Sequence, residues 1–172
     1  MNRKWHVGID IGLKGAICIM EDQGNNVINI DIHPMPVLKG KMDYHKLHNI
    51  IEKFEGFNGH VVFEKLGVIY GTSKTTAFSM GYQAGSLEAM LIAEAVPYTM
   101  VPAKKWQEEM FQGVTELKKS GSKRRDTKAM AEVAAKRLFP HLDLTMTERA
   151  RKPHDGLVDA LLMAEYSRRK FN

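Results

Sequence analysis

Four acidic residues interrupt apolar segments of this sequence. Asp10 and Glu64 each lie in a short apolar run with strand character, and Asp155 and Asp159 lie in a late apolar run. A buried carboxylate without a counter-charge is costly, so a set of four is expected to gather cations. Oxygen ligands suit Mg²⁺, with Mn²⁺ as a substitute. Two such ions roughly 4 Å apart can activate a water and stabilise the departing oxygen of a phosphodiester. The residue types therefore predict metal-assisted phosphodiester hydrolysis.

The spacing of the late pair predicts that both acids share one helical face. Asp155 and Asp159 are separated by four positions, which is about one helical turn. If Asp10 and Glu64 lie on neighbouring strands, this helix can bring its acids beside them. Each acid alone has an ordinary explanation, as a cap, a lysine partner or a solvated face, but the coincidence of four favours an active site. His154 could transfer a proton or contact a phosphate, or could simply be an exposed residue at the helix start.

Basic residues gather around the predicted active site. The chain has a net charge of +5, and residues 118–128 contain six basic residues against Asp126 alone. One such run is usually a solvated face, but several clusters flanking an acidic site favour contacts with the DNA backbone. Tyr70 is the candidate to stack on unpaired bases, whereas Trp106 is expected to pack in the core. The other predicted DNA contacts are Lys14, Lys65, Lys104, Lys105, Lys118, Lys119, Lys123, Arg124, Arg125, Lys128, Arg151, Lys152 and His154.

Hydrophobic periodicity predicts an α/β fold with a mixed five-stranded sheet flanked by helices. Strands are predicted at residues 5–11, 15–21, 27–33, 60–66 and 98–101. Helices are predicted at residues 43–54, 76–95, 125–139 and 153–169, with another beginning near Pro102. Residues 34–42 and 67–75 are expected to be loops, and residues 112–124 a mobile segment. The order of these elements resembles the ribonuclease H fold.

Composition narrows the class of protein. A length of 172 residues is most simply a single domain that spans the whole chain. The lone Cys18 excludes an intrachain disulfide and a cysteine zinc cluster, and its apolar neighbours predict burial. No apolar run is long enough to cross a bilayer, and Asp10 interrupts the first apolar stretch, so neither a membrane partner nor a signal peptide is expected. We therefore expect an intracellular protein.

The order and spacing of these segments are similar to those of the RuvC-like Holliday-junction resolvases, in particular the phage and poxvirus type. The resemblance runs from about residue 5 to about residue 170. It rests on residues 9–12 (IDIG), 62–65 (VFEK), 81–85 (GYQAG), 101–107 (VPAKKWQ), 137–140 (RLFP) and 154–162 (HDGLVDALL). It implies a ribonuclease H fold, a homodimer, and Mg²⁺-dependent nicking of two strands at a four-way DNA junction during recombination or repair. For a phage protein, the place of action would be the cytoplasm of a bacterial host.

The resemblance also implies roles for particular residues. It assigns the catalytic function to the four acids, and phosphate contacts to Lys105 and residues 123–125. Bacterial members space the two helical acids three apart, whereas Asp155 and Asp159 are four apart. This difference leaves open whether Asp155 or His154 contributes more. Phage relatives accept other branched DNA, so exclusivity for four-way junctions is not implied.

The helix predicted at residues 76–95 is the candidate dimer interface. Two symmetric nicks need two active sites, and a two-fold symmetric substrate is best matched by an isologous dimer. Packing within the chain could explain the same apolar side chains. Gly81 and Gly85, four apart on this helix, favour close helix packing over the approach of a partner. The proposed interface residues are Phe78, Met80, Leu87, Met90 and Leu91.

Two other classes of protein share some of these features. A non-catalytic DNA-binding module would keep the basic clusters but would not need four acids in apolar context. The actin and sugar-kinase superfamily of ATP-binding proteins also begins with an aspartate and a glycine between two strands. That fold needs two such domains and a second phosphate loop, for which this chain is too short.

Overall fold

A computed structural model describes residues 3–24, 26–54, 56, 58–67 and 71–171. Its centre is a five-stranded sheet with the order β3-β2-β1-β6-β7. β1 pairs antiparallel with β2, and β2 with β3, whereas β6 is parallel to both β1 and β7. The predicted mixed five-stranded sheet is therefore confirmed. Its strands are β1 (Arg3–Asp10), β2 (Ala16–Gln23), β3 (Asn26–Pro34), β6 (Gly59–Glu64) and β7 (Tyr98–Val101).

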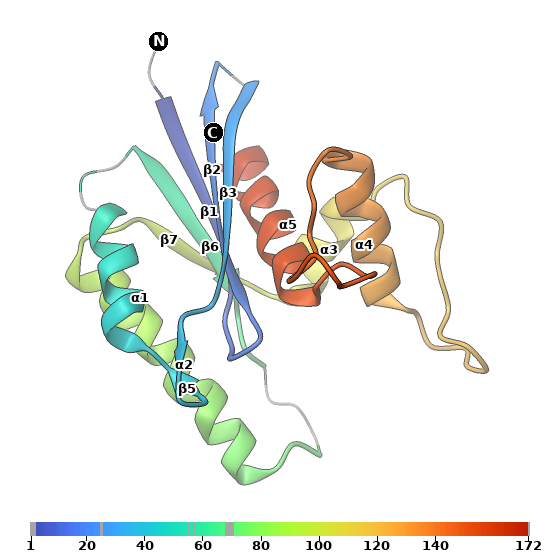
Figure 1. The fold of residues 1–172 in the computed structure, drawn as a ribbon, viewed down its shortest axis with the longest axis horizontal. Coiled ribbons are helices and arrows are strands. Elements are labelled where there is room, and N and C mark those ends of the chain that lie inside the picture. The colour runs from blue at the N-terminus through green and yellow to red at the C-terminus, as the bar shows by residue number, and fades with distance from the viewer. Residues whose placement is uncertain (1–2, 25, 55, 57, 68–70, 172) are drawn as a thin grey trace.

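Helices cover both faces of this sheet (Figure 1). On one face lie α1 (Tyr44–Ile51), the 3₁₀ turn Glu52–Phe54 and α2 (Lys74–Ala93). On the other lie α3 (Ala103–Met110), α4 (Thr127–Leu138) and α5 (Asp155–Lys170). α5 lies directly against β1, β2 and β6, while α3 and α4 pack on α5 and on each other.

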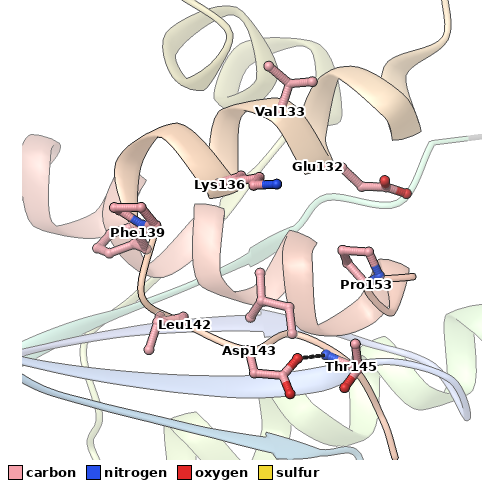
Figure 2. Close-up of a pocket in the computed structure, with 10 residues that line it drawn as sticks. Glu132, Val133, Lys136, Phe139, Leu142, Asp143, Thr145 and Pro153 are labelled. Atoms are coloured by element: carbon pink, nitrogen blue, oxygen red, sulfur yellow. Dashed lines mark hydrogen bonds between the residues drawn. The ribbon is translucent and has the colours of Figure 1, made fainter. Parts of the chain in front are cut away.

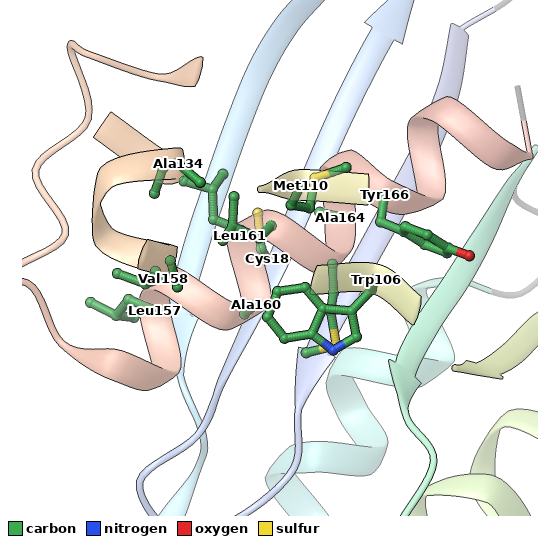
Figure 3. Packing of buried hydrophobic residues seen from close by; sticks show 14 of the residues in the cluster. Cys18, Trp106, Met110, Ala134, Leu157, Val158, Ala160, Leu161, Ala164 and Tyr166 are labelled. Carbon is green, nitrogen blue, oxygen red and sulfur yellow. The ribbon is translucent and has the colours of Figure 1, made fainter. Parts of the chain in front are cut away.

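The two faces of the sheet contribute to two separate cores. Val7 and Ile9 of β1 belong to the core under α1 and α2, whereas Gly8 between them faces α5. The alternation follows from the two-residue period of a strand. Figure 3 shows the second core, in which Cys18 and Trp106 pack beside α5. Both are fully buried, which confirms the packing predicted for them.

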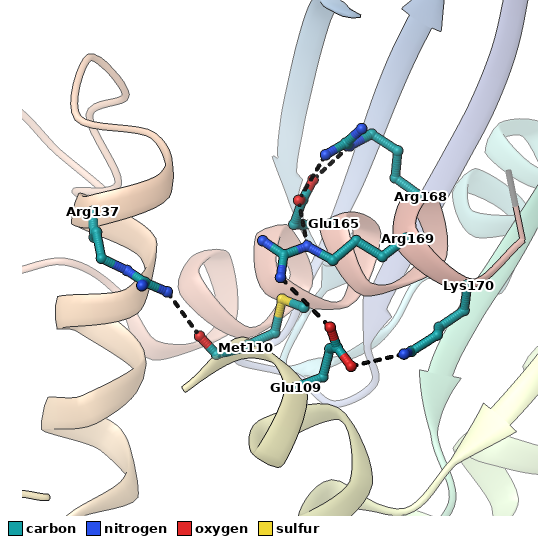
Figure 4. A network of polar contacts seen from close by, with 7 residues as sticks. All are labelled: Glu109, Met110, Arg137, Glu165, Arg168, Arg169 and Lys170. Atoms are coloured by element: carbon teal, nitrogen blue, oxygen red, sulfur yellow. Dashed lines mark hydrogen bonds and ion pairs between the residues drawn. The ribbon is translucent and has the colours of Figure 1, made fainter. Parts of the chain in front are cut away.

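A buried charged network joins α3 to the C-terminal half of α5 (Figure 4). Glu165 of α5 is buried and accepts hydrogen bonds from Arg168 at 2.7 Å and from Arg169 at 2.8 Å. Glu109 of α3 pairs with Lys170 at 2.7 Å and with Arg169 at 3.6 Å. Because the buried carboxylate is paired with two cations, it does not carry an uncompensated charge. The network holds α3 in place against α5.

Several element boundaries differ from the predicted ones. Residues 34–42, expected to be a loop, contain a short hairpin of β4 (Val37–Leu38) and β5 (Lys41–Met42). α2 begins two residues earlier than predicted because Ser73 caps it, and α4 begins two residues later because Asp126 caps it. α5 begins at Asp155 rather than at residue 153, because the His154 N–H donates to the Leu144 carbonyl at 2.7 Å.

A cavity of about 310 Å³ lies between α4 and the chain that leads to α5 (Figure 2). Apolar side chains such as Phe139 and Leu142 line it, with Glu132, Lys136 and Asp143 at polar positions. None of the four acids lines this cavity. In the described part of the chain, no helix combines the length and apolar character needed to cross a membrane.

Candidate active site

The strand register places Asp10 and Glu64 side by side. β1 and β6 are parallel and remain paired up to Ile9 and Phe63, so the next residue of each strand is an acid. Neighbouring strands are about 4.8 Å apart. Gly8 and Val62, two residues earlier, both face α5. Because side chains alternate along a strand, Asp10 and Glu64 project toward the same helix.

Two glycines allow α5 to approach the strands closely. A Cβ on Gly8 would lie 2.1 Å from the Ala160 carbonyl oxygen, so the helix backbone rests on β1 at this point. A Cβ on Gly156 would lie 2.3 Å from the Lys14 carbonyl oxygen, so the first turn of α5 rests on the β1–β2 turn. These two contacts fix both ends of the segment that contains Asp155 and Asp159. The helical acids are thereby held next to Asp10.

Asp10 and Asp159 lie near enough to the other acids for those negative charges to disfavour their ionisation. Burial raises the pKa of Asp10 to about 7, with the Glu64 and Asp155 carboxylates adding to the effect. Burial likewise raises the pKa of Asp159 to about 7, and Asp10, Glu64 and Asp155 raise it further. Burial also raises the pKa of Glu64. Desolvation and like charges both disfavour ionisation, so this group of acids would be stabilised by added positive charge.

Lys128, in the first turn of α4, supplies one such charge. Its ammonium forms an ion pair with the Asp155 carboxylate, whereas Asp10, Glu64 and Asp159 form no ion pair with any described residue. The nearby Lys128 charge also partly offsets the raised pKa values of Asp10 and Asp159.

The donor chemistry of this group fits a hard divalent cation, because all four side chains offer carboxylate oxygens. As placed, however, no three described histidine, cysteine, aspartate or glutamate side chains converge closely enough to hold a metal ion. Asp155 is about half exposed, with 48% of its side chain accessible, and it is turned toward Lys128. Closing a metal site would therefore require a rearrangement of side chains.

Trp106 is a neighbour of the acids that sequence reasoning assigned only to packing. Its indole is fully buried and meets Phe111 edge-on, with ring centroids 6.3 Å apart. Its Nε1–H makes no hydrogen bond within 3.5 Å, yet it lies near enough to Glu64 to lower the pKa of that carboxyl against the effect of burial. No local pattern in the sequence indicates that the indole N–H faces an acid.

The predicted DNA-binding residues fall into several groups around these acids. Lys14 lies in the β1–β2 turn under α5, and Lys65 directly follows Glu64; both are exposed. Lys104 and Lys105 are exposed at the start of α3, which follows the end of β7. Because β6 and β7 are parallel, with Glu64 opposite Val101, the start of α3 lies at the same end of the sheet as the acids.

The segment before α5 carries the remaining predicted contacts. Arg151 and Lys152 are exposed, and His154 occupies the N-cap position of α5. The His154 side chain caps no backbone N–H, and its buried Nδ1 has no hydrogen-bond partner. Tyr70, predicted to stack on bases, lies outside the described residues.

Residues 117–126 form what we call the basic hairpin. The Asp126 N–H donates to the Leu117 carbonyl at 2.7 Å, and the Lys119 N–H donates to the Arg124 carbonyl at 2.9 Å. Figure 1 shows the connection from α3 to α4, which contains this segment, extending away from the sheet beyond α4. The segment predicted to be mobile therefore contains local hydrogen-bonded structure, in which Gly121 adopts a φ of 67° and closes a tight turn. The exposed basic side chains of the hairpin are Lys118, Lys119, Lys123, Arg124 and Arg125.

The sheet order, the helices on both faces and the acids at one end of β1 and β6 together define a ribonuclease H-like α/β fold. Solved structures of RuvC from Thermus thermophilus share this fold. One, RuvC in complex with a Holliday junction substrate, has a TM-score of 0.52 at 12% identity, over 95% of this chain and 90% of that chain. A second RuvC structure has a TM-score of 0.52 at 14% identity, over 97% and 96% of the two chains. No protein-family model matches the sequence, and no curated protein matches it significantly.

Proposed function

We propose that this protein is a structure-selective endodeoxyribonuclease that resolves four-way DNA junctions, and other branched DNA, by paired nicks. The observation that carries the proposal is the placement of Asp10, Glu64, Asp155 and Asp159 at one end of the sheet, where burial and the neighbouring acids raise the pKa values of Asp10 and Asp159 to about 7. The RuvC-like fold supports it, since one such structure holds a Holliday junction. The family would be the phage and poxvirus type of resolvase, with one nuclease domain acting inside the cell.

The four acids would hold two Mg²⁺ ions, for which Mn²⁺ would substitute. When bound, such ions activate a water for attack on phosphorus and stabilise the departing oxygen. Asp10, Glu64 and Asp159, which form no ion pair in the described part of the chain, would supply three carboxylates, and Asp155 would supply the fourth at the exposed edge. The Trp106 indole N–H would offset part of the burial that raises the pKa of Glu64, and so would favour the ionised form that binds a cation.

The basic groups would follow the DNA backbone on either side of the acids. The basic hairpin, Lys104 and Lys105 would bind phosphates distant from the cleaved bond, while Lys14, Lys65 and Lys128 would lie close to it. Arg151, Lys152 and His154 would contact the strand near the start of α5. Tyr70 would stack on a base at the branch point.

A homodimer would pair two active sites on one junction, with the first half of α2, residues 74–86, at its interface. Phe78 and Tyr82 there are 75% and 58% exposed. A Cβ on Gly81 or Gly85 would meet nothing within 4 Å, so the close packing within the chain expected for these glycines is wrong, and both are open to a partner. Large apolar surface left exposed beside small residues favours docking of another chain.

The interface predicted from the sequence needs one correction. Leu87 and Leu91 are fully buried in the core under α2, so they cannot contact a partner. The second half of α2, which contains Leu87 and Leu91, therefore packs in the core, while the first half is exposed.

The test is cleavage of a synthetic four-way junction, with Mg²⁺ or with chelator, beside a linear duplex of the same sequence. Asp10→Asn, Glu64→Gln, Asp155→Asn and Asp159→Asn should each reduce nicking by orders of magnitude while binding survives. Normal cleavage by two or more of these variants would show that the four acids are not the active site. Junction binding without any nicking would favour a non-catalytic DNA-binding module, and ATP binding would favour the kinase-like class.

A further inference from the structure

Lys128 connects the basic hairpin to the acid group. It lies in the first turn of α4, two residues after Asp126, which ends the basic hairpin and caps this helix. Although 71% of its side chain is exposed, the ammonium does not point freely into solvent. It donates a hydrogen bond to Oδ2 of Asp155, at the start of α5. Lys128 therefore contacts the acid group through its side chain, although in sequence it follows directly after the basic hairpin.

The ion pair between Lys128 and Asp155 differs from an ordinary surface pair. Exposed pairs contribute little, because water screens them well. The anion here is one member of a group of four carboxylates, and Lys128 also interacts favourably with Asp10 and Asp159. Lys14 and Lys65 are adjacent to the acids in space or sequence, yet neither pairs with them in the described structure. Lys128 is thus the cation that balances part of this charge.

We infer that Lys128 is a placeholder cation that occupies Asp155 until a divalent metal binds and displaces it. The inference rests on the proposed function, because it requires the acids to be a metal site. It accounts for the position of Asp155, which is the most exposed of the four acids and is turned to the Lys128 ammonium. Release of Asp155 would let it face the other three carboxylates.

Competition between two cations for one carboxylate has a direct consequence. Each metal-binding event must break the Lys128–Asp155 pair, so the lysine weakens metal binding while it stabilises the metal-free site. A variant without the charge should bind metal more tightly, because neither the ion pair nor the repulsion by the ammonium then opposes the incoming cation. An ordinary surface pair, or a lysine that only contacts DNA, would not produce this effect in the absence of DNA.

The test measures Mn²⁺ binding to the DNA-free protein by calorimetry or by electron paramagnetic resonance. Lys128→Met should tighten Mn²⁺ binding by about 5- to 10-fold, the size expected for loss of one close competing charge. Lys128→Arg, which keeps the charge, should bind like wild type. Arg3→Met is the matched control, because Arg3 is also an exposed cation in an ion pair, with Glu21 at 2.9 Å, at the opposite end of β1 from Asp10, and its loss should leave Mn²⁺ affinity unchanged.

A double-mutant cycle with Asp155→Asn completes the test. If Lys128 acts through Asp155, Lys128→Met should have little further effect on Mn²⁺ affinity in that background. Equal or weaker Mn²⁺ binding by Lys128→Met overturns the placeholder role. If that occurs while Asp10→Asn still abolishes Mn²⁺ binding, the proposed function survives. If wild type binds no Mn²⁺, or Asp10→Asn binds it normally, the metal site itself is wrong.

Discussion

Replacing Asp10 with asparagine should stabilise the metal-free protein, and the gain should grow with pH. Burial raises the pKa of this carboxyl from 3.8 to about 7 in the folded state. Between roughly pH 4 and pH 7, the folded protein therefore keeps a proton that the unfolded chain has released, and stability falls as pH rises through this window. Asparagine is neutral at every pH and has nearly the same shape. Asp10→Asn therefore removes the fall in stability that ionisation of Asp10 causes as pH rises.

The size of the effect follows from the pKa difference. A change from 3.8 to about 7, at about 1.36 kcal/mol per unit, corresponds to about 4 kcal/mol at pH 8. At pH 5, only the interval from 3.8 to 5 contributes, which is about 1.5 kcal/mol. The stability difference between Asp10→Asn and wild type should therefore grow by about 2.5 kcal/mol between these two pH values. Since Asp10 also repels Asp159, the variant should lower the pKa of Asp159.

Urea unfolding in the presence of chelator measures this difference at both pH values. Asp143→Asn is a suitable control, because Asp143 is exposed and asparagine can still accept the hydrogen bond from the Thr145 N–H. The control should show no comparable dependence on pH. Mg²⁺ should stabilise wild type at pH 8 but not Asp10→Asn, since the cation replaces the missing counter-charge. A stability difference that is equal at pH 5 and pH 8 would refute the argument that Asp10 is held in a costly ionised state.

Three further outcomes are expected. Gly8→Ala should lower the free energy of unfolding by about 3 kcal/mol or more, because the added Cβ would clash with the backbone of α5. Gly81→Ala, the control, should be neutral or slightly stabilising. Equal effects of the two substitutions in urea unfolding would refute the close approach of α5 to β1. Alanine at residues 123–125 should reduce the slope of log K against log salt by about 0.9 for each lost phosphate contact, and an unchanged slope would exclude the basic hairpin from the DNA interface. Wild type mixed with excess Asp10→Asn protein should nick a cruciform plasmid on one strand but rarely linearise it, unless the protein acts as a monomer.

The strands and the position of the acids could be predicted from the sequence because they depend on local pattern. β-branched runs separated by residues such as Gly24 and Asn26 produce the meander whatever lies around it. Asp10 and Glu64 each end an apolar strand. When these two strands pair in parallel and in register, the two acids come together. The four-residue spacing of Asp155 and Asp159 requires only that the segment is helical. The outline of the acid group is thus encoded over short distances along the chain.

Tertiary structure decided which charges are balanced and which surfaces stay open. Lys128 meets Asp155 across 27 positions, and Trp106 approaches Glu64 across two elements, so neither contact depends on a local pattern. Gly81 and Gly85 have the spacing of a packed helix, yet a Cβ on either would meet nothing within 4 Å, and Figure 1 shows the first half of α2 extending beyond the sheet. Long-range packing sets these features, since a side chain's neighbours depend on where whole helices come to rest.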